Sequence, residues 1–371
     1  MDSTLVADLL ADAARSGVFP GCALLVADDM RPVWRAAFGR VATWPVPGPP
    51  ASVDTVYDVA SVTKAAATAL VVMRLIEAGR LSLDSPACAF VPELAGPGKE
   101  RIRVRDLLCH ASGLPAWRPL FERIGPGERE RTPSARDRIL RMAAGEPVER
   151  EPGTRSVYSD LGFMVLGLVV ERAGGDRLDR LAERVVFEPL GMNETRFVDL
   201  DAAPRAVTPS QVAPTEACPR RGLVVGEVHD DNCHAAGGIL GHAGLFSTVN
   251  DLSRLCHALA GAWQGERVPG GFPPEMVREF FSPCGIPGST WRLGWDGPSP
   301  PPGASQAGDL WPKTGVGHLG FTGCSAWIDL ERARWVILLS NRVHPSREDQ
   351  RIKVVRPRVH DAIVRMLSVG G

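Results

Sequence analysis

The sequence lacks a disulfide framework, a long apolar run and a surplus of either charge. Its eight cysteines are dispersed without a CxxC pair, so we interpret them as reduced thiols. Its 42 basic and 43 acidic side chains give a formal net charge of −1, and the arginines are mixed with acids. This balance disfavours nucleic-acid binding. The longest apolar runs, such as residues 163–170, are too short to span a bilayer, so no membrane protein is predicted.

The first residues also lack the features of a secretory signal. They have no cationic start, no unbroken apolar stretch and no small-residue cleavage site, which predicts a cytoplasmic protein. With 371 residues, 44% of them hydrophobic, the chain is a globular protein near the upper size limit of one core. We therefore expect two packed lobes or one large domain with an inserted subdomain.

Strand patterns stand at the two ends of the chain, around a mostly helical middle that runs from about residue 102 to 170. Apolar spacing predicts helices over 5–14, 65–78, 159–175, 250–260 and 359–367, and strands over 22–29, 33–41, 318–330 and 333–341. Asn250 or Asp251 is expected to open its helix. The pattern predicts an α/β (α+β) fold with a sheet lobe from residues 1–65 and 245–371, a helical lobe from 66–244, and an active site between them.

The first fragment that points to chemistry is Ser61-Val62-Thr63-Lys64. If the apolar helix begins at Ser61, then Lys64 lies one turn later on the same face, within reach of the serine oxygen. A serine hydroxyl needs such a neighbour to become a nucleophile, and a helix start offers free N–H groups to an oxyanion. The SxxK pattern is short and often carries no function. Lysine is rare in this chain, however, and a buried lysine is costly without a partner or a task.

The second fragment is Tyr158-Ser159-Asp160, directly before an apolar helix. An adjacent ammonium stabilises a phenolate, so Lys64 is expected to lower the pKa of Tyr158 and allow it to take the Ser61 proton. The alternative is an aromatic residue at a helix start that Ser159 or Asp160 caps. The chain contains only two tyrosines, so this residue type is not used freely to fill the core.

The third fragment runs from His318 through Gly320 and Phe321 to Gly323. Small residues on an edge strand let a substrate pair with the backbone, and the amide after Gly320 could share an oxyanion with the amide of Ser61. A cation or hydrogen-bond donor at His318 would polarise the site from the opposite wall. A glycine-rich hairpin turn is the alternative.

In this order and at these separations, the three fragments resemble the active-site motifs of the serine β-lactamase and penicillin-binding-protein superfamily, in its class C branch. That branch includes class C β-lactamases, D-alanyl-D-alanine carboxypeptidases, D-aminopeptidases and family VIII esterases. The resemblance extends over about residues 15–367, notably in the segments 107–115, 187–197, 241–255 and 338–345. It implies a β-lactamase/transpeptidase-like fold, with an antiparallel sheet flanked by helices and an inserted, mostly helical subdomain.

By position, the resemblance implies that Ser61 is the acylated nucleophile, Lys64 and Tyr158 handle protons, and the amides of Ser61 and Phe321 form the oxyanion hole. His318 would stand where many relatives have the lysine of a KTG triplet. The literal triplet Lys313-Thr314-Gly315 is the alternative, but the register of the following strand favours His318.

A further departure from the pattern concerns substrate binding, which the resemblance places at Asp160, Gly320 and Phe321. Asp160 stands where class C β-lactamases usually have asparagine. A carboxylate in place of an amide donor is expected to disfavour acidic ligands such as penicillins.

These features predict a serine hydrolase that cleaves a small ester, amide or β-lactam through an acyl-enzyme on Ser61, without a metal or an organic cofactor. A carboxylesterase or a D-peptidase or amidase is expected, with β-lactam hydrolysis as a side activity. The alternative is a non-catalytic penicillin-recognising or peptide-binding module that is acylated without turnover. An interaction scaffold, with a serine that no reagent labels, is the third hypothesis.

Two other groups of residues allow a functional interpretation. One contains possible zinc ligands, namely His229, Asp231, Cys233, His234 and His242. It shows neither an HxxxH nor a CxxC spacing, so a polar loop that borders the cleft is predicted instead. The other contains Trp291, Trp295 and Trp327, which are expected in the core rather than in a substrate pocket.

Overall fold

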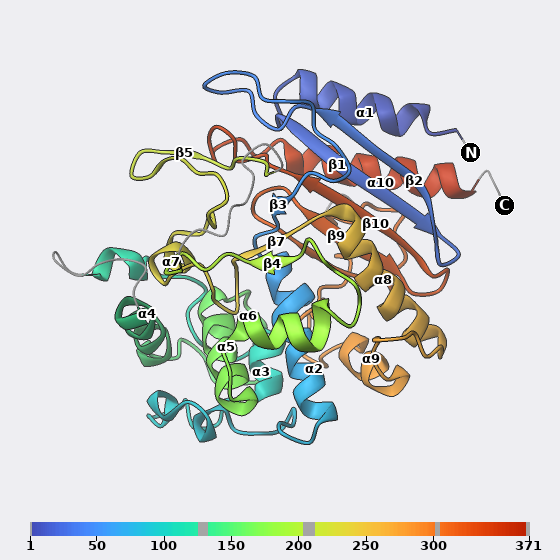
Figure 1. Ribbon diagram of the computed structural model, residues 1–371. Helices are drawn as coiled ribbons and strands as arrows, with labels where there is room; N and C mark the ends of the chain where they lie inside the picture. Colours follow the sequence, from blue (N-terminus) through green and yellow to red (C-terminus); the bar gives the residue numbers. More distant parts are fainter. Residues whose placement is uncertain (1, 125–132, 203–211, 301–304, 369–371) are drawn as a thin grey trace.

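The computed structural model describes residues 2–124, 133–202, 212–300 and 305–368. Its largest sheet has five strands in the order β2-β1-β10-β9-β8, and all neighbouring strands are antiparallel. These strands are β1 (Gly21–Asp28), β2 (Arg31–Gly39), β8 (Val316–Leu319), β9 (Ser325–Asp329) and β10 (Arg334–Ser340). The two ends of the chain thus meet in one sheet, where β1 pairs with β10 (Figure 1).

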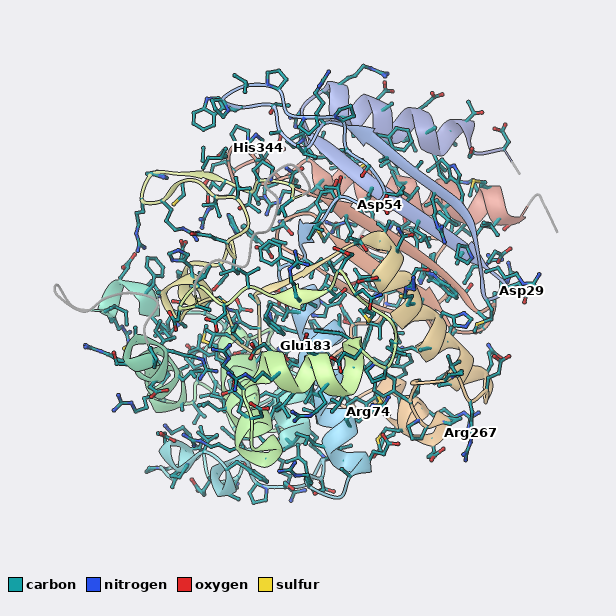
Figure 2. All side chains as sticks on the ribbon, in the orientation of Figure 1. Asp29, Asp54, Arg74, Glu183, Arg267 and His344 are labelled. Atoms are coloured by element: carbon teal, nitrogen blue, oxygen red, sulfur yellow. The ribbon has the colours of Figure 1, made fainter. Side chains whose placement is uncertain are left out.

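The two strands predicted over 22–29 and 33–41 pair as an antiparallel hairpin, β1 and β2. β1 and β2 are joined at Asp29 and Met30, whose φ angles of 47° and 62° are both left-handed, as a tight turn between twisted strands requires. Asp29 lies at the tip of this hairpin (Figure 2). Pro32 is tolerated in β2 because this strand is the edge of the sheet.

Helices cover the five-stranded sheet on its two faces. Leu24 and Val26 of β1 pack in one apolar cluster with α1 (Thr4–Arg15) and α10 (Ile352–Ser368). The alternate residues Ala23 and Leu25 belong to the main core, which includes α8 (Val249–Gln264). Because both faces of β1 are buried, its sequence is a nearly continuous apolar run.

The remaining elements lie mostly on the side of the sheet that faces α8 (Figure 1). The α-helices are α2 (Ala69–Glu77), α3 (Val104–Leu108), α4 (Pro133–Gly145), α5 (Asp160–Gly174), α6 (Leu178–Ala182), α7 (Asp231–Ala235) and α9 (Pro274–Phe281). Short strands form a three-stranded sheet, β3 (Tyr57–Asp58), β7 (Leu245–Ser247) and β4 (Arg196–Phe197), and a hairpin, β5 (Ala217–Cys218) and β6 (Gly222–Leu223). The 3₁₀ turns are Ala87–Ala89, Pro92–Leu94 and Leu120–Arg123, and a π-helical turn covers Glu183–Phe187.

The antiparallel sheet with a helical insertion between its strands confirms the predicted α+β fold class. The division at 65/66 and 244/245 stays a prediction, and residues 125–132 of the predicted helical middle lie outside the described residues. In the part of the chain that the structure describes, no helix is both long and apolar enough to cross a bilayer.

Several boundaries differ from the predicted ones for local reasons. The closing helix begins at Ile352 rather than at 359, since its first turns are charged and contain Pro357 but still bury Ile352 against the sheet. The helix predicted from 250 begins at Val249, because the Thr248 hydroxyl accepts the Asp251 N–H at 3.2 Å and caps it. The helix predicted over 65–78 starts as a π-helical turn, Lys64–Thr68, before α2.

Candidate active site

Ser61 lies at a sharp change of chain direction between β3 and the helix that follows. The preceding residue, Ala60, has a left-handed φ of 47°, which is strained for a residue with a Cβ atom. The carboxylate of Asp58 holds this bend by accepting the Ala60 N–H at 2.8 Å. Ser61 is half-buried and lines a cavity of about 680 Å³. The bend therefore presents the hydroxyl to a space large enough for a small substrate.

Lys64 lies one turn later and is completely buried. Its ammonium donates to Ser61 Oγ at 2.9 Å and to the carbonyl oxygen of His242 at 3.0 Å, and it pairs with Asp160 Oδ1 at 2.7 Å. Lys64 therefore has two hydrogen-bond acceptors and one carboxylate at ion-pair distance. Burial alone would lower the pKa of Lys64, but the Asp160 carboxylate and Tyr158 outweigh it and the pKa is raised. Lys64 therefore rests as a cation that donates to Ser61.

The Tyr158 hydroxyl lies within hydrogen-bonding range of both Ser61 and Lys64, so the predicted convergence of these three side chains is present. The Lys64 nitrogen is 4.8 Å from the centre of the tyrosine ring. The pKa of Tyr158, however, is raised and not lowered, because desolvation and the Asp160 carboxylate together exceed the effect of the Lys64 ammonium. Tyr158 lines the cavity and is 37% exposed as a residue, and its hydroxyl rests as a phenol.

His318, on β8, lines the same cavity as Ser61 and is also buried. Its Nδ1 is 2.8 Å from the carbonyl oxygen of Leu319, which can only accept, so Nδ1 carries the proton. Burial and then the Lys64 charge lower the pKa of His318 to about 3. The ring is therefore neutral, and its Nε2 is an acceptor without a partner among the described residues. This differs from the cation or donor that the sequence suggested.

Lys313 does not share this position. Its side chain is exposed, and it is not among the residues that line the cavity. The neighbouring Thr314 donates to Glu331 at 2.9 Å, so the literal KTG triplet lies at the start of β8 and away from Ser61. Of His318 and Lys313, the two residues that could match the lysine of the relatives' KTG triplet, only His318 faces the cavity.

The predicted oxyanion donors are available. Within the described residues, neither the Ser61 N–H nor the Phe321 N–H donates to another protein group. Gly320 allows the β8–β9 turn to approach the backbone of Val59 closely, because a Cβ at Gly320 would collide with the carbonyl oxygen of Val59. The Thr322 hydroxyl fixes the turn by donating to the Asp58 carbonyl at 2.7 Å.

The remaining wall is largely aromatic. Trp291 stacks on Tyr158, with ring centres 5.5 Å apart, and Trp117 and Phe321 are about half exposed at the cavity. Trp295 and Trp327 are core residues as predicted, whereas Trp291 lines the cavity. This wall offers apolar surface to an acyl or leaving group.

His110 was not singled out from the sequence, and His242 was named there only as a possible zinc ligand in a loop that borders the cleft. His110 accepts the Ser159 N–H at 3.0 Å and supports Tyr158 with ring centres 4.7 Å apart. Its pKa is far below the usual range, because of burial and then the Lys64 charge. His242 lines the cavity and binds Lys64 through its carbonyl. Both lie in segments on which the family resemblance rests, 107–115 and 241–255, and this is the one signal that could have marked them.

The candidate zinc ligands do not converge. His229 pairs with Glu216 at 3.0 Å, His234 with Glu227 at 3.2 Å and His242 with Asp230 at 3.0 Å. The described residues contain no group of three or more His, Cys, Asp or Glu side chains placed to hold a metal ion. Of these residues His229, Asp231 and His242 line the cavity, which agrees with the polar loop that the sequence predicts there.

Comparison with known proteins gives consistent matches over most of the chain. The Beta-lactamase family model matches residues 6–358. A protein of Escherichia coli (strain K12) named "Putative D-alanyl-D-alanine carboxypeptidase" is 30% identical over 354 residues, which cover 88% of this chain and 79% of that protein. An N-acetylmuramyl-L-alanine amidase of Bacillus subtilis (strain 168) is 29% identical over 352 residues, with 88% and 78% covered.

The fold is also found among solved structures. The octameric penicillin-binding protein homologue from Pyrococcus abyssi superposes with a TM-score of 0.74 at 23% identity, covering 100% of this chain and 78% of that one. The β-lactamase/transpeptidase-like fold that the resemblance implied is thereby confirmed.

Proposed function

The chain belongs to the Beta-lactamase family of serine hydrolases, and on this premise we propose that it cleaves ester or amide bonds through a covalent acyl-enzyme on Ser61. One observation carries the proposal: a buried Lys64 ammonium, paired with Asp160, donates to Ser61 Oγ at 2.9 Å at the wall of a cavity. A neighbouring cation stabilises the alkoxide character that serine needs for attack. A purely structural serine would not require this costly arrangement.

In the acylation step, Ser61 Oγ attacks the carbonyl carbon of the substrate. The Tyr158 phenol takes the Ser61 proton while it gives its own proton to the leaving oxygen or nitrogen. This relay needs no resting phenolate, which agrees with the raised pKa of Tyr158. The amides of Ser61 and Phe321 donate to the oxyanion, an effect worth about 10² to 10³ in rate per donor in other enzymes.

Deacylation uses the same groups in reverse. Water attacks the acyl carbon and gives a proton to Tyr158, whose own proton passes to Ser61 Oγ as the ester bond breaks. Lys64 keeps its charge in both steps and holds the serine oxygen in place. The residues of this chain supply all the proton transfers that the cycle requires.

Charge at the reacting end of the cavity favours uncharged acyl groups. Lys64 and Asp160 compensate each other, and His318 is neutral, so no free cation stands beside Ser61 among these groups. The relatives are named as a carboxypeptidase and an amidase, and both of these classes cleave amides. We therefore propose small neutral esters and amides as substrates, with a β-lactam as a poorer acyl donor.

The test is to trap the acyl-enzyme. A short-chain nitrophenyl ester and a chromogenic cephalosporin are each mixed with the full chain, and peptide mass spectrometry follows acylation while absorbance follows product. A transient adduct on the Ser61 peptide together with product supports the proposal. A lasting adduct without product would instead identify an acylated binding module, and no adduct with either reagent would identify a scaffold.

We expect His318→Ala to reduce kcat/KM for the ester by about tenfold or more, because it removes an acceptor without a partner from the cavity that Ser61 lines. Lys313→Ala, an exposed and matched control, should leave the rate unchanged. Since the pKa of His318 is about 3, the loss should be the same from pH 5 to pH 9. If kcat/KM falls in Lys313→Ala and not in His318→Ala, the role proposed for His318 belongs instead to Lys313 of the Lys313-Thr314-Gly315 triplet.

Asp160→Asn should move the alkaline limit of activity to lower pH. The Asp160 carboxylate raises the pKa of both Lys64 and Tyr158. Removal of the carboxylate lowers the pKa of Lys64 and the pKa of Tyr158. The active state, with a charged lysine and a neutral phenol, is therefore lost at a lower pH. The measurement is the profile of kcat/KM between pH 6 and pH 11 for wild type and variant. An alkaline limb that does not move would contradict the coupling of these groups.

A further inference from the structure

The turn that carries one of the two oxyanion donors joins β8 to β9. It covers residues 320–323 and is closed by the Gly323 N–H, which donates to the Gly320 carbonyl at 3.0 Å. Phe321 and Thr322 are its central residues, and Phe321, whose N–H is the proposed donor, is half exposed at the cavity. Four-residue turns differ from one another in the orientation of the central peptide. The carbonyl of that peptide must therefore be held if the turn is to keep one geometry.

Arg342, a buried residue that follows β10, holds the carbonyls of both central residues. Its Nε donates to the Phe321 carbonyl at 2.8 Å, and its backbone N–H donates to the Thr322 carbonyl, also at 2.8 Å. Its guanidinium carbon lies 4.3 Å from the centre of the Phe321 ring, a distance at which a cation is attracted to an aromatic face. Arg342 therefore fixes the main chain and the side chain of Phe321 together.

The guanidinium of Arg342 is itself anchored at its other end. Its Nη1 donates to the Arg347 carbonyl at 2.7 Å and to the Asp349 carbonyl at 2.8 Å, in the segment that leads to α10. Arg334, on β10 and buried to a similar extent, pairs instead with the Asp28 carboxylate at 2.9 Å. The contrast indicates that Arg342 holds the main chain of two segments together rather than balancing a charge.

A second contact ties the same turn to the bend before Ser61. The Thr322 hydroxyl donates to the Asp58 carbonyl at 2.7 Å, and the Asp58 carboxylate accepts the Ala60 N–H at 2.8 Å. The two proposed oxyanion donors thus belong to segments that meet at Asp58. Among the described residues, however, Arg342 is the one donor to the Phe321 carbonyl. Loss of that bond leaves the central peptide of the turn unsupported.

We propose that Arg342 is a positioning residue, which holds the 320–323 turn so that the Phe321 N–H faces the oxyanion of the transition state. The role rests on the proposed acyl-enzyme function, because it has an effect only when a tetrahedral oxyanion forms beside Ser61. It is a role of geometry rather than of charge. The planar guanidinium keeps Nε and Nη1 in a fixed fork that spans two segments, and a lysine ammonium, as a point charge, does not reproduce this fork.

Two substitutions separate the geometry from the charge. Arg342→Met removes the fork and the charge, whereas Arg342→Lys removes only the fork. We expect both variants to reduce kcat/KM for the nitrophenyl ester by about tenfold to 10²-fold. Loss of one oxyanion donor costs about 10² to 10³ in rate, and a donor that is displaced rather than lost is expected to cost less. A displacement of about 1 Å is enough for a loss of about 10²-fold.

The experiment compares binding of the transition state with binding of the ground state. Phenylboronic acid adds to a serine hydroxyl and places an oxygen where the oxyanion would lie, so its Ki should rise by the same factor as kcat/KM falls. The Kd of the unreacted ester is measured in Ser61→Ala, with and without the Arg342 substitution, and should not change. A purely structural role would not produce this split between Ki and Kd.

Arg334→Met is the matched control, since Arg334 is buried but is not among the residues that line the cavity. It should lower the temperature of thermal unfolding without a change in kcat/KM or in the Ki of phenylboronic acid. All variants are checked by thermal unfolding, and Arg342→Lys, which keeps the charge and most of the length of the side chain, provides the test if Arg342→Met does not fold.

The outcomes distinguish this proposal from the one on which it rests. Full activity in Arg342→Lys would assign the effect of Arg342 to its charge and overturn the positioning role. An unchanged Ki of phenylboronic acid in the folded variants would overturn it as well. If the wild-type chain neither binds phenylboronic acid nor forms an acyl adduct on Ser61, the proposed hydrolase function itself fails.

Discussion

Ser61→Ala should reduce ester hydrolysis by at least about 10⁴-fold, which is the range seen when the nucleophile of a serine hydrolase is removed. The variant keeps the cavity, the oxyanion donors and Tyr158, but it has no oxygen to form the acyl bond. A residual rate slightly above the uncatalysed reaction is expected from the oxyanion donors alone. The variant should also show no acyl adduct on the peptide that contains residue 61.

The loss should not come from unfolding. Ser61 is half-buried, and Lys64 keeps the His242 carbonyl and the Asp160 carboxylate as partners without it, so removal of the hydroxyl should cost about 1 kcal/mol of stability. Thermal unfolding of the variant tests this. Ser82→Ala, at an exposed serine away from the cavity, is the matched control and should keep full activity. Equal rates in wild type and Ser61→Ala would end the assignment of the nucleophile.

The sequence was sufficient to place Ser61 and Lys64 together. The Ser61-Lys64 spacing needs only one turn of helix, and the apolar residues after Lys64 indicate that this turn is buried. The apolar runs at the two ends of the chain were sufficient to predict the strands that form the five-stranded sheet. These patterns are local in the sequence, so they can be interpreted without knowledge of the tertiary contacts.

The protonation states could not be predicted, because they depend on contacts between distant segments. The pKa of Tyr158 depends on whether the Asp160 carboxylate points at Lys64, and in the structure it does. The role of His318 depends on which nitrogen bonds to Leu319. His110 was missed for a similar reason, since nothing in its spacing shows that it lies under the Tyr158 ring. For Tyr158 and His318 the residue itself was known from the sequence, but its partner was not.

Lys64→Met should reduce kcat/KM by about 10³-fold and also lower the stability. Methionine has a similar volume and no charge, so the core remains filled while Ser61 loses its donor. The Asp160 carboxylate, whose side chain is 18% exposed, is left without its cation, and we expect a cost of about 2 kcal/mol in the free energy of unfolding. Activity and thermal unfolding are both measured on this variant.

The double variant Lys64→Met/Asp160→Asn separates the two effects. Asparagine removes the unpaired charge, so most of the lost stability should return, because a compensated ion pair replaced by neutral groups is close to neutral in energy. Activity should not return, since no cation then faces Ser61 Oγ. Recovery of both stability and turnover in the double variant would mean that Lys64 only balances Asp160 and that the serine is activated by another group. Recovery of stability alone would assign the ammonium to the reaction itself.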